Sequence, residues 1–175
     1  PLASIVDRSI PGPAGDIPVR VYTPAGDGPF PLIAYFHGGG YVSGDLDTQD
    51  MIARALSCGA GAVLVSVDYR LAPENPFPAG PDDCWAATQW VAAHAPELDG
   101  DAGRLAVAGD SAGANFAAGV ALRARDAGGP RIAAQVMFYG SCDYPSTATP
   151  ASRKFADGPI LTTDDVAYFW ELYLS

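Results

Sequence analysis

Four unbroken apolar runs that alternate with helical patterns constrain the fold of this 175-residue chain more than any other feature. Strands without alternating polar side chains are typical of parallel sheets that are buried on both faces. Parallel neighbours require a crossover connection, which helices usually supply. The sequence therefore predicts an α/β fold. The apolar runs are Leu32–Phe36, Ala62–Asp68, Leu105–Ala108 and Ala134–Tyr139, and the helical patterns between them are Thr48–Ser57, Pro81–Ala95 and Ala112–Arg125.

Two further strand candidates, Ser4–Ser9 and Pro18–Thr23, are more polar and precede the others. Their composition indicates an antiparallel edge of the sheet. Hydrophobic residues make up 49% of the chain, which is ordinary for a packed domain, and the length suits one domain. Neither an internal repeat nor an interdomain linker is visible. We therefore expect residues 1–175 to form a single domain, with a mostly parallel sheet flanked by helices.

The run Leu105–Ala108 ends in Gly109-Asp110-Ser111-Ala112-Gly113, and a helical pattern of small residues follows. A G-x-S-x-G turn between a strand and a helix is the pattern of a nucleophile elbow, in which a strained turn raises one serine above the sheet. Gly109 and Gly113 permit the tight backbone and the close approach of helix and strand. Because these residue types are common, the motif carries weight only in this context. The context predicts that Ser111 is a catalytic nucleophile.

A second glycine motif, His37-Gly38-Gly39-Gly40, ends the apolar run Pro31–Phe36. Acyl transfer develops negative charge on a carbonyl oxygen, and backbone N–H groups must already point at that oxygen. Consecutive glycines let the main chain approach a substrate with no side chain in the way. The alternative is a plain glycine-rich turn between a strand and a helix. We expect His37 to hold the glycine loop by hydrogen bonds rather than to act as the general base.

A third motif, Asp68-Tyr69-Arg70-Leu71-Ala72-Pro73-Glu74, follows the strand candidate. Taken alone it is a charged turn in which Arg70 could pair with Asp68 or Glu74. Taken with the two glycine motifs, in this order along the chain, it resembles the hormone-sensitive-lipase-like esterases, a bacterial family (family IV) of the α/β-hydrolase fold. The resemblance runs from about Ser9 to the end of the chain.

The resemblance implies a carboxylic-ester hydrolase, of carboxylesterase or lipase type, that acts on a small-molecule ester and needs no metal or other cofactor. Ser111 would be the nucleophile that forms an acyl-enzyme. The N–H groups of Gly39, Gly40 and Ala112 would form the oxyanion hole. Tyr41 would line the mouth of the substrate pocket. The resemblance also implies a structural ion-pair network made by Asp68, Arg70 and Glu74.

The triad partners of the serine are the largest departure from the family's pattern. In this fold a carboxylate and then a histidine follow the serine along the chain, but no histidine follows Ser111. His37 and His94 both precede it, and His94 ends a helical pattern, where it complements the helix dipole. We expect the triad acid and histidine to lie beyond Ser175 or in a second chain. The acidic residues weighed for this role and set aside are Asp143, Asp157, Asp164 and Asp165, of which the last two indicate a helix start.

The sequence therefore indicates the central part of a longer α/β-hydrolase, which would be a partial catalytic domain. We expect cap helices before Pro1 and further strands after Ser175, so that the fold is incomplete at its C-terminal end. A helical pattern over Asp165–Leu174 would contribute to the lid side of the site. Alone, the chain is expected to be inactive, since a serine without a base is a weak nucleophile. Two alternatives stay open: a small-molecule binding protein on the same fold, and an inactive truncated remnant.

Charge and cysteine content argue against several other classes. Acidic residues number 20 and basic residues 10, and the net charge of −10 argues against nucleic acid or an anionic membrane as a partner. No apolar run approaches the ~18 residues of a membrane span. Cys58, Cys84 and Cys142 are odd in number and widely spaced, which predicts buried free thiols in a reducing cytoplasm rather than disulfides or a zinc site. A homodimer through a sheet edge and the preferred ester chain length both stay open.

Overall fold

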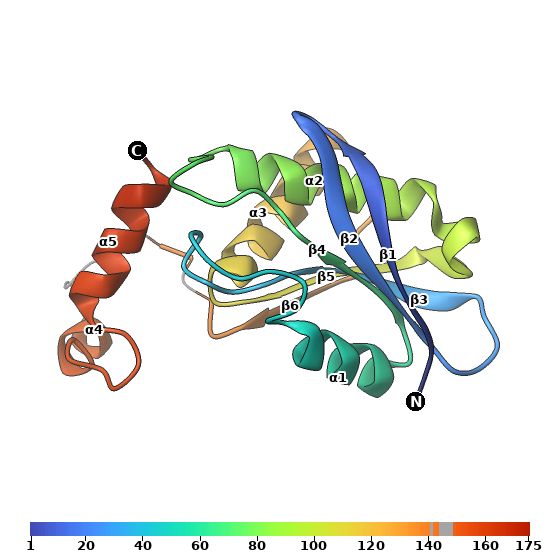
Figure 1. Ribbon diagram of the computed structural model, residues 1–175, viewed down its shortest axis with the longest axis horizontal. Coiled ribbons are helices and arrows are strands. Elements are labelled where there is room, and N and C mark those ends of the chain that lie inside the picture. The colour runs from blue at the N-terminus through green and yellow to red at the C-terminus, as the bar shows by residue number, and fades with distance from the viewer. Residues whose placement is uncertain (141, 144–148) are drawn as a thin grey trace.

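The computed structural model describes residues 1–140, 142–143 and 149–175, and in this part of the chain six strands form one sheet with helices on both faces (Figure 1). The strand order is β1-β2-β4-β3-β5-β6. β3 pairs in parallel with β4 and β5, and β5 pairs in parallel with β6. The strands span Leu2–Gly12 (β1), Gly15–Pro24 (β2), Phe30–Phe36 (β3), Val63–Val67 (β4), Gly100–Asp110 (β5) and Ala134–Phe138 (β6).

The predicted antiparallel edge is confirmed. β1 and β2 form an antiparallel hairpin, and β2 also runs antiparallel to β4. Both strands are longer than predicted, because their pairing continues to the turn between Gly12 and Gly15. β5 is longer too, since it begins at Gly100, ahead of its apolar run. Apolar residues predict only the buried part of a strand. Backbone hydrogen bonds extend each of these strands beyond that part.

Three helices cover the two faces of the sheet. α2 (Ala79–Ala93) and α3 (Ala112–Ala127) lie on one face, and α1 (Asp50–Ala60) lies on the other (Figure 1). The predicted helices are therefore confirmed, and a short 3-10 helix, η1 (Ala95–Leu98), follows α2 without having been predicted. A large buried cluster joins α2 and α3 to the sheet, and a smaller one lies beneath α1. All five side chains of β4 are buried, as a central parallel strand requires.

β6 differs from the prediction of a strand buried on both faces. Its side chains are largely exposed, and those of Val136 and Met137 are 41% and 36% exposed. β6 pairs with β5 along one edge, but no described strand pairs along its other edge. An apolar run predicts a strand and its direction, whereas the burial of that strand depends on neighbours that the run does not specify.

The described residues after β6 contain two helices, α4 (Pro150–Lys154) and α5 (Thr163–Tyr173). α5 was predicted and α4 was not. A reciprocal capping box begins α5, because the Thr162 N–H donates to Asp165 Oδ2 at 2.9 Å and the Asp165 N–H donates to Thr162 Oγ1 at 3.1 Å. The predicted acidic helix start is therefore confirmed. α5 stands beyond the end of the sheet at which the parallel strands finish (Figure 1).

The prediction of buried thiols holds for Cys84 and is wrong for Cys58 and Cys142, which are exposed. α1 buries Ala53 and Ser57 against the sheet, and Cys58 falls outside that stripe. Cys142 lies past the end of β6. Within the described residues, no helix has both the length and the apolar character needed to cross a membrane.

Candidate active site

Ser111 lies between β5 and α3 with backbone angles of φ 51° and ψ −117°, a conformation that residues with side chains rarely adopt. Its N–H donates to the carbonyl of Phe138 at 2.9 Å. Packing requires the flanking glycines, because a Cβ at Gly109 would overlap the backbone of Gly113, and a Cβ at Gly113 would overlap the backbone of Phe36. The turn therefore has the strained shape that a nucleophile elbow requires.

The glycine loop after β3 folds so tightly that it excludes side chains at its centre. Gly39 has a φ of 133° and Gly40 a φ of 61°. The carbonyl of Gly39 accepts from the N–H groups of Val42 at 3.1 Å and Ser43 at 3.0 Å. A Cβ at Gly39 would overlap the carbonyl of Ser43. The backbone of the two glycines can therefore approach a ligand directly, as an oxyanion hole requires.

Asp110 joins the elbow to the glycine loop. Its Oδ1 accepts from the Gly38 N–H at 2.9 Å and from the Tyr35 hydroxyl at 2.6 Å. Its Oδ2 accepts from the Tyr139 hydroxyl at 3.3 Å. Because β3 and β5 are parallel neighbours with Phe36 opposite Gly109, the two loops meet at the same end of the sheet. Asp110 was not among the predicted site residues, although a carboxylate beside the nucleophile at the end of a buried strand was a visible signal.

A cavity of about 450 Å³ lies between the elbow, the glycine loop and α5. The residues that sequence reasoning assigned to the site all line it: Ser111, Ala112, Gly39, Gly40 and Tyr41. The opposite wall is apolar and comes from the segment that ends in α5, through Ile160, Leu161, Val166, Phe169 and Trp170. Its size and lining are typical of a small-molecule site, with apolar walls and a few converging polar groups. The chemical roles of the lining residues stay predictions.

Tyr41, which follows the glycine loop, packs against α5. Its ring stacks on Tyr173 at a centroid distance of 4.2 Å and meets the edge of Trp170 at 5.3 Å. Burial raises the pKa of the Tyr41 phenol, and its hydroxyl has no hydrogen-bond partner among the described residues. At the other end of this contact, the Phe77 N–H donates to the carbonyl of Tyr173 at 2.7 Å. The apolar wall is therefore fixed to the core at its C-terminal end.

His37 is enclosed beneath the glycine loop. Its Nδ1 lies 2.7 Å from the carbonyl of Gly38, and its ring stacks on Tyr69 at 4.3 Å. The Tyr69 hydroxyl donates to the carbonyl of His37 at 2.6 Å. The expected structural role agrees with these contacts. Burial lowers the pKa of the His37 imidazole, because the charged form would lose its hydration.

The stability of the protein should fall as pH drops below about 6.5, the ordinary imidazole value. In that range the unfolded chain binds a proton at His37 that the folded chain does not, so the free energy of unfolding decreases by up to about 1.4 kcal/mol per pH unit until the folded pKa is reached. Urea unfolding between pH 7.5 and 5 measures this slope. His37→Gln should have the shallower slope, and parallel curves for the two proteins would contradict the assignment.

Arg70 does not form the ion pair predicted for it. Its guanidinium pairs with Asp83 of α2, with Nε–Oδ2 and Nη2–Oδ1 distances of 2.8 Å, instead of with Asp68 or Glu74. The Arg70 N–H also donates to Asp83 Oδ2 at 3.0 Å. The reason is packing: α2 carries Asp83 into the core with 2% of its side chain exposed, whereas Glu74 is exposed. A buried carboxylate needs a partner more than an exposed one does.

Arg70→Leu should lower the free energy of unfolding by about 2–3 kcal/mol, because it leaves Asp83 buried without its cation. Breaking a fully buried pair costs ~3–5 kcal/mol, and the expected loss is smaller here because 32% of the Arg70 side chain is exposed. Urea unfolding at neutral pH measures the change. Arg125→Leu, which breaks the exposed pair with Asp126, is the matched control and should have a much smaller effect. Equal losses in the two variants would refute this account of the buried pair.

Within the described residues, neither histidine forms a hydrogen bond with the Ser111 hydroxyl: His37 is enclosed beneath the glycine loop, and His94 stacks on Trp90 at the end of α2. Of the acids weighed earlier, Asp157 forms a β-bridge with Thr162, and Asp165 belongs to the capping box. In the same described part of the chain, no group of three or more His, Cys, Asp or Glu residues is placed to hold a metal ion.

The chain is similar to known proteins over most of its length. A model of the alpha/beta hydrolase fold family matches residues 33–175. Esterase LipI of Mycobacterium tuberculosis is 49% identical over 176 residues, which cover 99% of this chain and 55% of LipI. Carboxylesterase NlhH of the same organism is 50% identical over 160 residues, which cover 91% of this chain and 50% of NlhH. The chain thus spans about half the length of these relatives.

Solved structures give the same result. The hyperthermophilic esterase of the archaeon Pyrobaculum calidifontis is 44% identical with a TM-score of 0.93, over 100% of this chain and 58% of its own. A thermophilic carboxylesterase cloned from a metagenomic library is 41% identical with a TM-score of 0.95, over 99% of this chain and 60% of its own. Both the predicted fold class and the predicted resemblance are therefore confirmed. The chain belongs to the α/β-hydrolase fold family, and it resembles the hormone-sensitive-lipase-like esterases of that fold.

Proposed function

We propose that the protein hydrolyses carboxylic esters, with Ser111 as the nucleophile. The observation that carries the proposal is the shared cavity, in which the strained serine and the backbone of Gly39 and Gly40 face an apolar wall. Acyl transfer requires a nucleophile and N–H donors that line one space. The names of the relatives, esterase and carboxylesterase, support the same reaction class.

In the proposed reaction the Ser111 oxygen attacks the ester carbonyl and its proton passes to a general base. Negative charge develops on the carbonyl oxygen, and the N–H groups of Gly39, Gly40 and Ala112 stabilise it. Collapse of the tetrahedral intermediate expels the alcohol and leaves an acyl group on the serine, and water then releases the acid. We propose that the histidine acting as base, and the carboxylate that orients it, come from a segment outside these 175 residues or from a second chain.

The cavity favours a neutral ester with an apolar group. Its far wall is built from Val166, Phe169 and Trp170, none of which carries a charge. Phe169 lies so close to the loop that a Cβ at Gly40 would contact its ring. An apolar acyl or alcohol group could therefore pack on α5 while its carbonyl faces the glycine backbone.

The test is turnover of p-nitrophenyl butyrate by the protein as its gene encodes it. We expect catalytic release of p-nitrophenolate, with saturation at high ester concentration. Binding without release, detected as a change in tryptophan fluorescence, would overturn the proposal and favour the alternative of a small-molecule binding protein on this fold. Neither binding nor release would favour the inactive remnant.

A further inference from the structure

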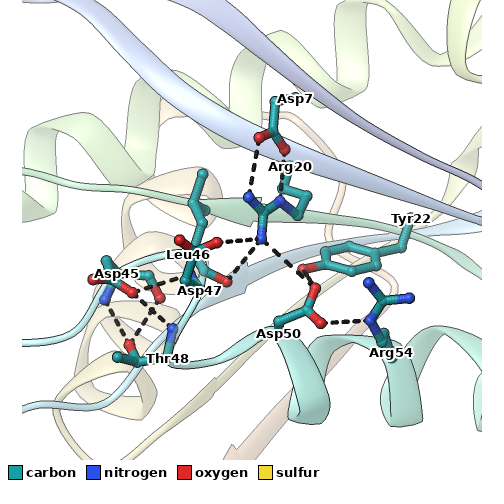
Figure 2. Close-up of polar contacts among 9 residues, drawn as sticks. All are labelled: Asp7, Arg20, Tyr22, Asp45, Leu46, Asp47, Thr48, Asp50 and Arg54. Atoms are coloured by element: carbon teal, nitrogen blue, oxygen red, sulfur yellow. Dashed lines mark hydrogen bonds and ion pairs between the residues drawn. The ribbon is translucent and has the colours of Figure 1, made fainter.

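A second polar cluster lies beside the segment that leads from the glycine loop to α1. Its centre is Arg20 of β2, whose side chain is 16% exposed. Asp7 lies directly opposite in the antiparallel hairpin and binds the guanidinium through two bonds, Nε–Oδ1 at 2.6 Å and Nη2–Oδ2 at 3.0 Å (Figure 2). A bidentate pair of this kind fixes the plane of the guanidinium. The remaining nitrogen, Nη1, is thereby aimed away from β1.

Nη1 of Arg20 reaches the chain that leads from the glycine loop into α1. It donates to Asp47 Oδ1 at 2.8 Å and to the carbonyl of Leu46 at 3.4 Å (Figure 2). Asp50 Oδ1 lies 3.6 Å from the same nitrogen and also accepts from the Tyr22 hydroxyl at 2.9 Å. The Arg20 side chain therefore contacts both the segment that follows the glycine loop and the start of α1.

The segment that Arg20 holds is locally stiff. Asp45 Oδ1 accepts from the N–H groups of Asp47 at 3.0 Å and Thr48 at 2.7 Å. The Asp45 N–H donates to Thr48 Oγ1 at 2.9 Å, and that hydroxyl bonds back to the carbonyl of Asp45 at 3.1 Å. These bonds close a short turn in which Asp45 and Asp47 have little freedom to move separately. A displacement at Asp47 would therefore be passed to Asp45.

The two residues before Asp45, Gly44 and Ser43, contact the glycine loop directly. A Cβ at Gly44 would overlap the ring of His37 and the carbonyl of Gly38, so the backbone there packs directly against the start of the glycine loop. Both the N–H and the hydroxyl of Ser43 donate to the carbonyl of Gly39 at 3.0 Å. Arg20 is thus linked to Gly39 through a continuous set of described contacts.

We propose that Arg20 is a positioning residue for the oxyanion hole. It holds the segment after the glycine loop to the sheet, at Leu46 and Asp47, while Asp110 holds the start of the loop at Gly38. The N–H groups of Gly39 and Gly40 thereby keep their positions and directions. The proposal rests on the proposed function of these glycines. Arg20 itself does not line the cavity, so it acts on the reaction only through the loop.

Arg20→Gln should lower kcat for p-nitrophenyl butyrate about tenfold, since small displacements from changes remote from the reacting atoms can cost up to ~100-fold. KM should stay within about twofold, because the cavity wall is unchanged. Arg104→Gln is the matched control: it removes the same charge from an exposed pair with Asp101 and should leave kcat unchanged. Asp47→Ala removes the side-chain contact between Arg20 and this segment, keeps the longer bond to the Leu46 carbonyl, and should lower kcat in the same direction by a smaller factor.

The decisive measurement is the double variant, Arg20→Gln with Asp47→Ala, assayed below the unfolding transition of every variant. Its kcat should equal that of Arg20→Gln alone, because both changes release one anchor. A normal kcat in Arg20→Gln with a lower unfolding midpoint would overturn the proposal and leave a purely structural role. If Arg20→Gln does not fold, a normal kcat in Asp47→Ala overturns it equally. Ser111→Ala in the same assay separates the claims, because activity near that of the parent protein would refute the proposed role of Ser111 itself.

Discussion

Ser111→Ala is expected to lower kcat for ester hydrolysis by a factor on the order of 10⁶, as loss of a serine nucleophile does in other hydrolases. The fold should persist, because the bond that holds the turn is donated by the backbone N–H of residue 111 to the carbonyl of Phe138, and alanine keeps it. Alanine can adopt the turn's unusual backbone angles about as well as serine can, so little stability should be lost. Steady-state kinetics on p-nitrophenyl butyrate measure the effect.

Ser43→Ala is the matched control for that variant. Ser43 also lines the cavity, and its hydroxyl donates to the carbonyl of Gly39. The Ser43 N–H would still bond to the same carbonyl, so kcat should fall only a few-fold. Comparable losses in the two variants would mean that the hydroxyl at position 111 has no special role.

Asp110→Ala should lower kcat by about 10²–10³, the cost of losing one oxyanion-hole donor. The carboxylate is the partner of the Gly38 N–H, and its removal frees the inner end of the glycine loop. KM should change less than kcat, because Asp110 is not among the residues that line the cavity. The variant should also lose stability, since the Tyr35 hydroxyl and the Gly38 N–H would be buried without their acceptor.

Tyr35→Phe distinguishes a catalytic effect of Asp110 from a loss of stability. It removes one donor to Asp110 Oδ1 and keeps the bond from Gly38. We expect a lower unfolding midpoint with kcat near that of the parent protein. If Tyr35→Phe and Asp110→Ala lower kcat to the same extent, the loop is not held in the way described.

Local sequence predicted those parts of the site that local backbone chemistry determines. The elbow around Ser111 and the tight turn at Gly39 require glycine at particular positions within a few residues, so both are visible as motifs. The anchors of these loops are not visible in this way. Asp110 and Gly38 are 72 residues apart, and Arg20 and Asp47 are 27 apart. Only the order of strands in the sheet brings such residues together.

The errors have the same origin. Arg70 was predicted to pair with a near neighbour in its own motif, whereas α2 presents Asp83 to it from 13 residues away. β6 was predicted correctly as a parallel strand, but its exposure follows from what packs around it rather than from its composition. Five-residue α4 has too little apolar periodicity to be visible, and its start depends on the cap that Thr149 provides through its bond from the Ser152 N–H.

The most direct test of the central claim is covalent labelling of the gene-encoded protein with a fluorophosphonate, followed by intact mass and peptide mapping. A serine activated beside an oxyanion hole attacks the phosphorus centre, and the product resembles the tetrahedral intermediate. We predict one adduct per protein, located on Ser111, and its loss in Ser111→Ala with no new label elsewhere. An adduct on another residue, or an unlabelled protein that still hydrolyses p-nitrophenyl butyrate, would contradict the assignment of Ser111 as the nucleophile.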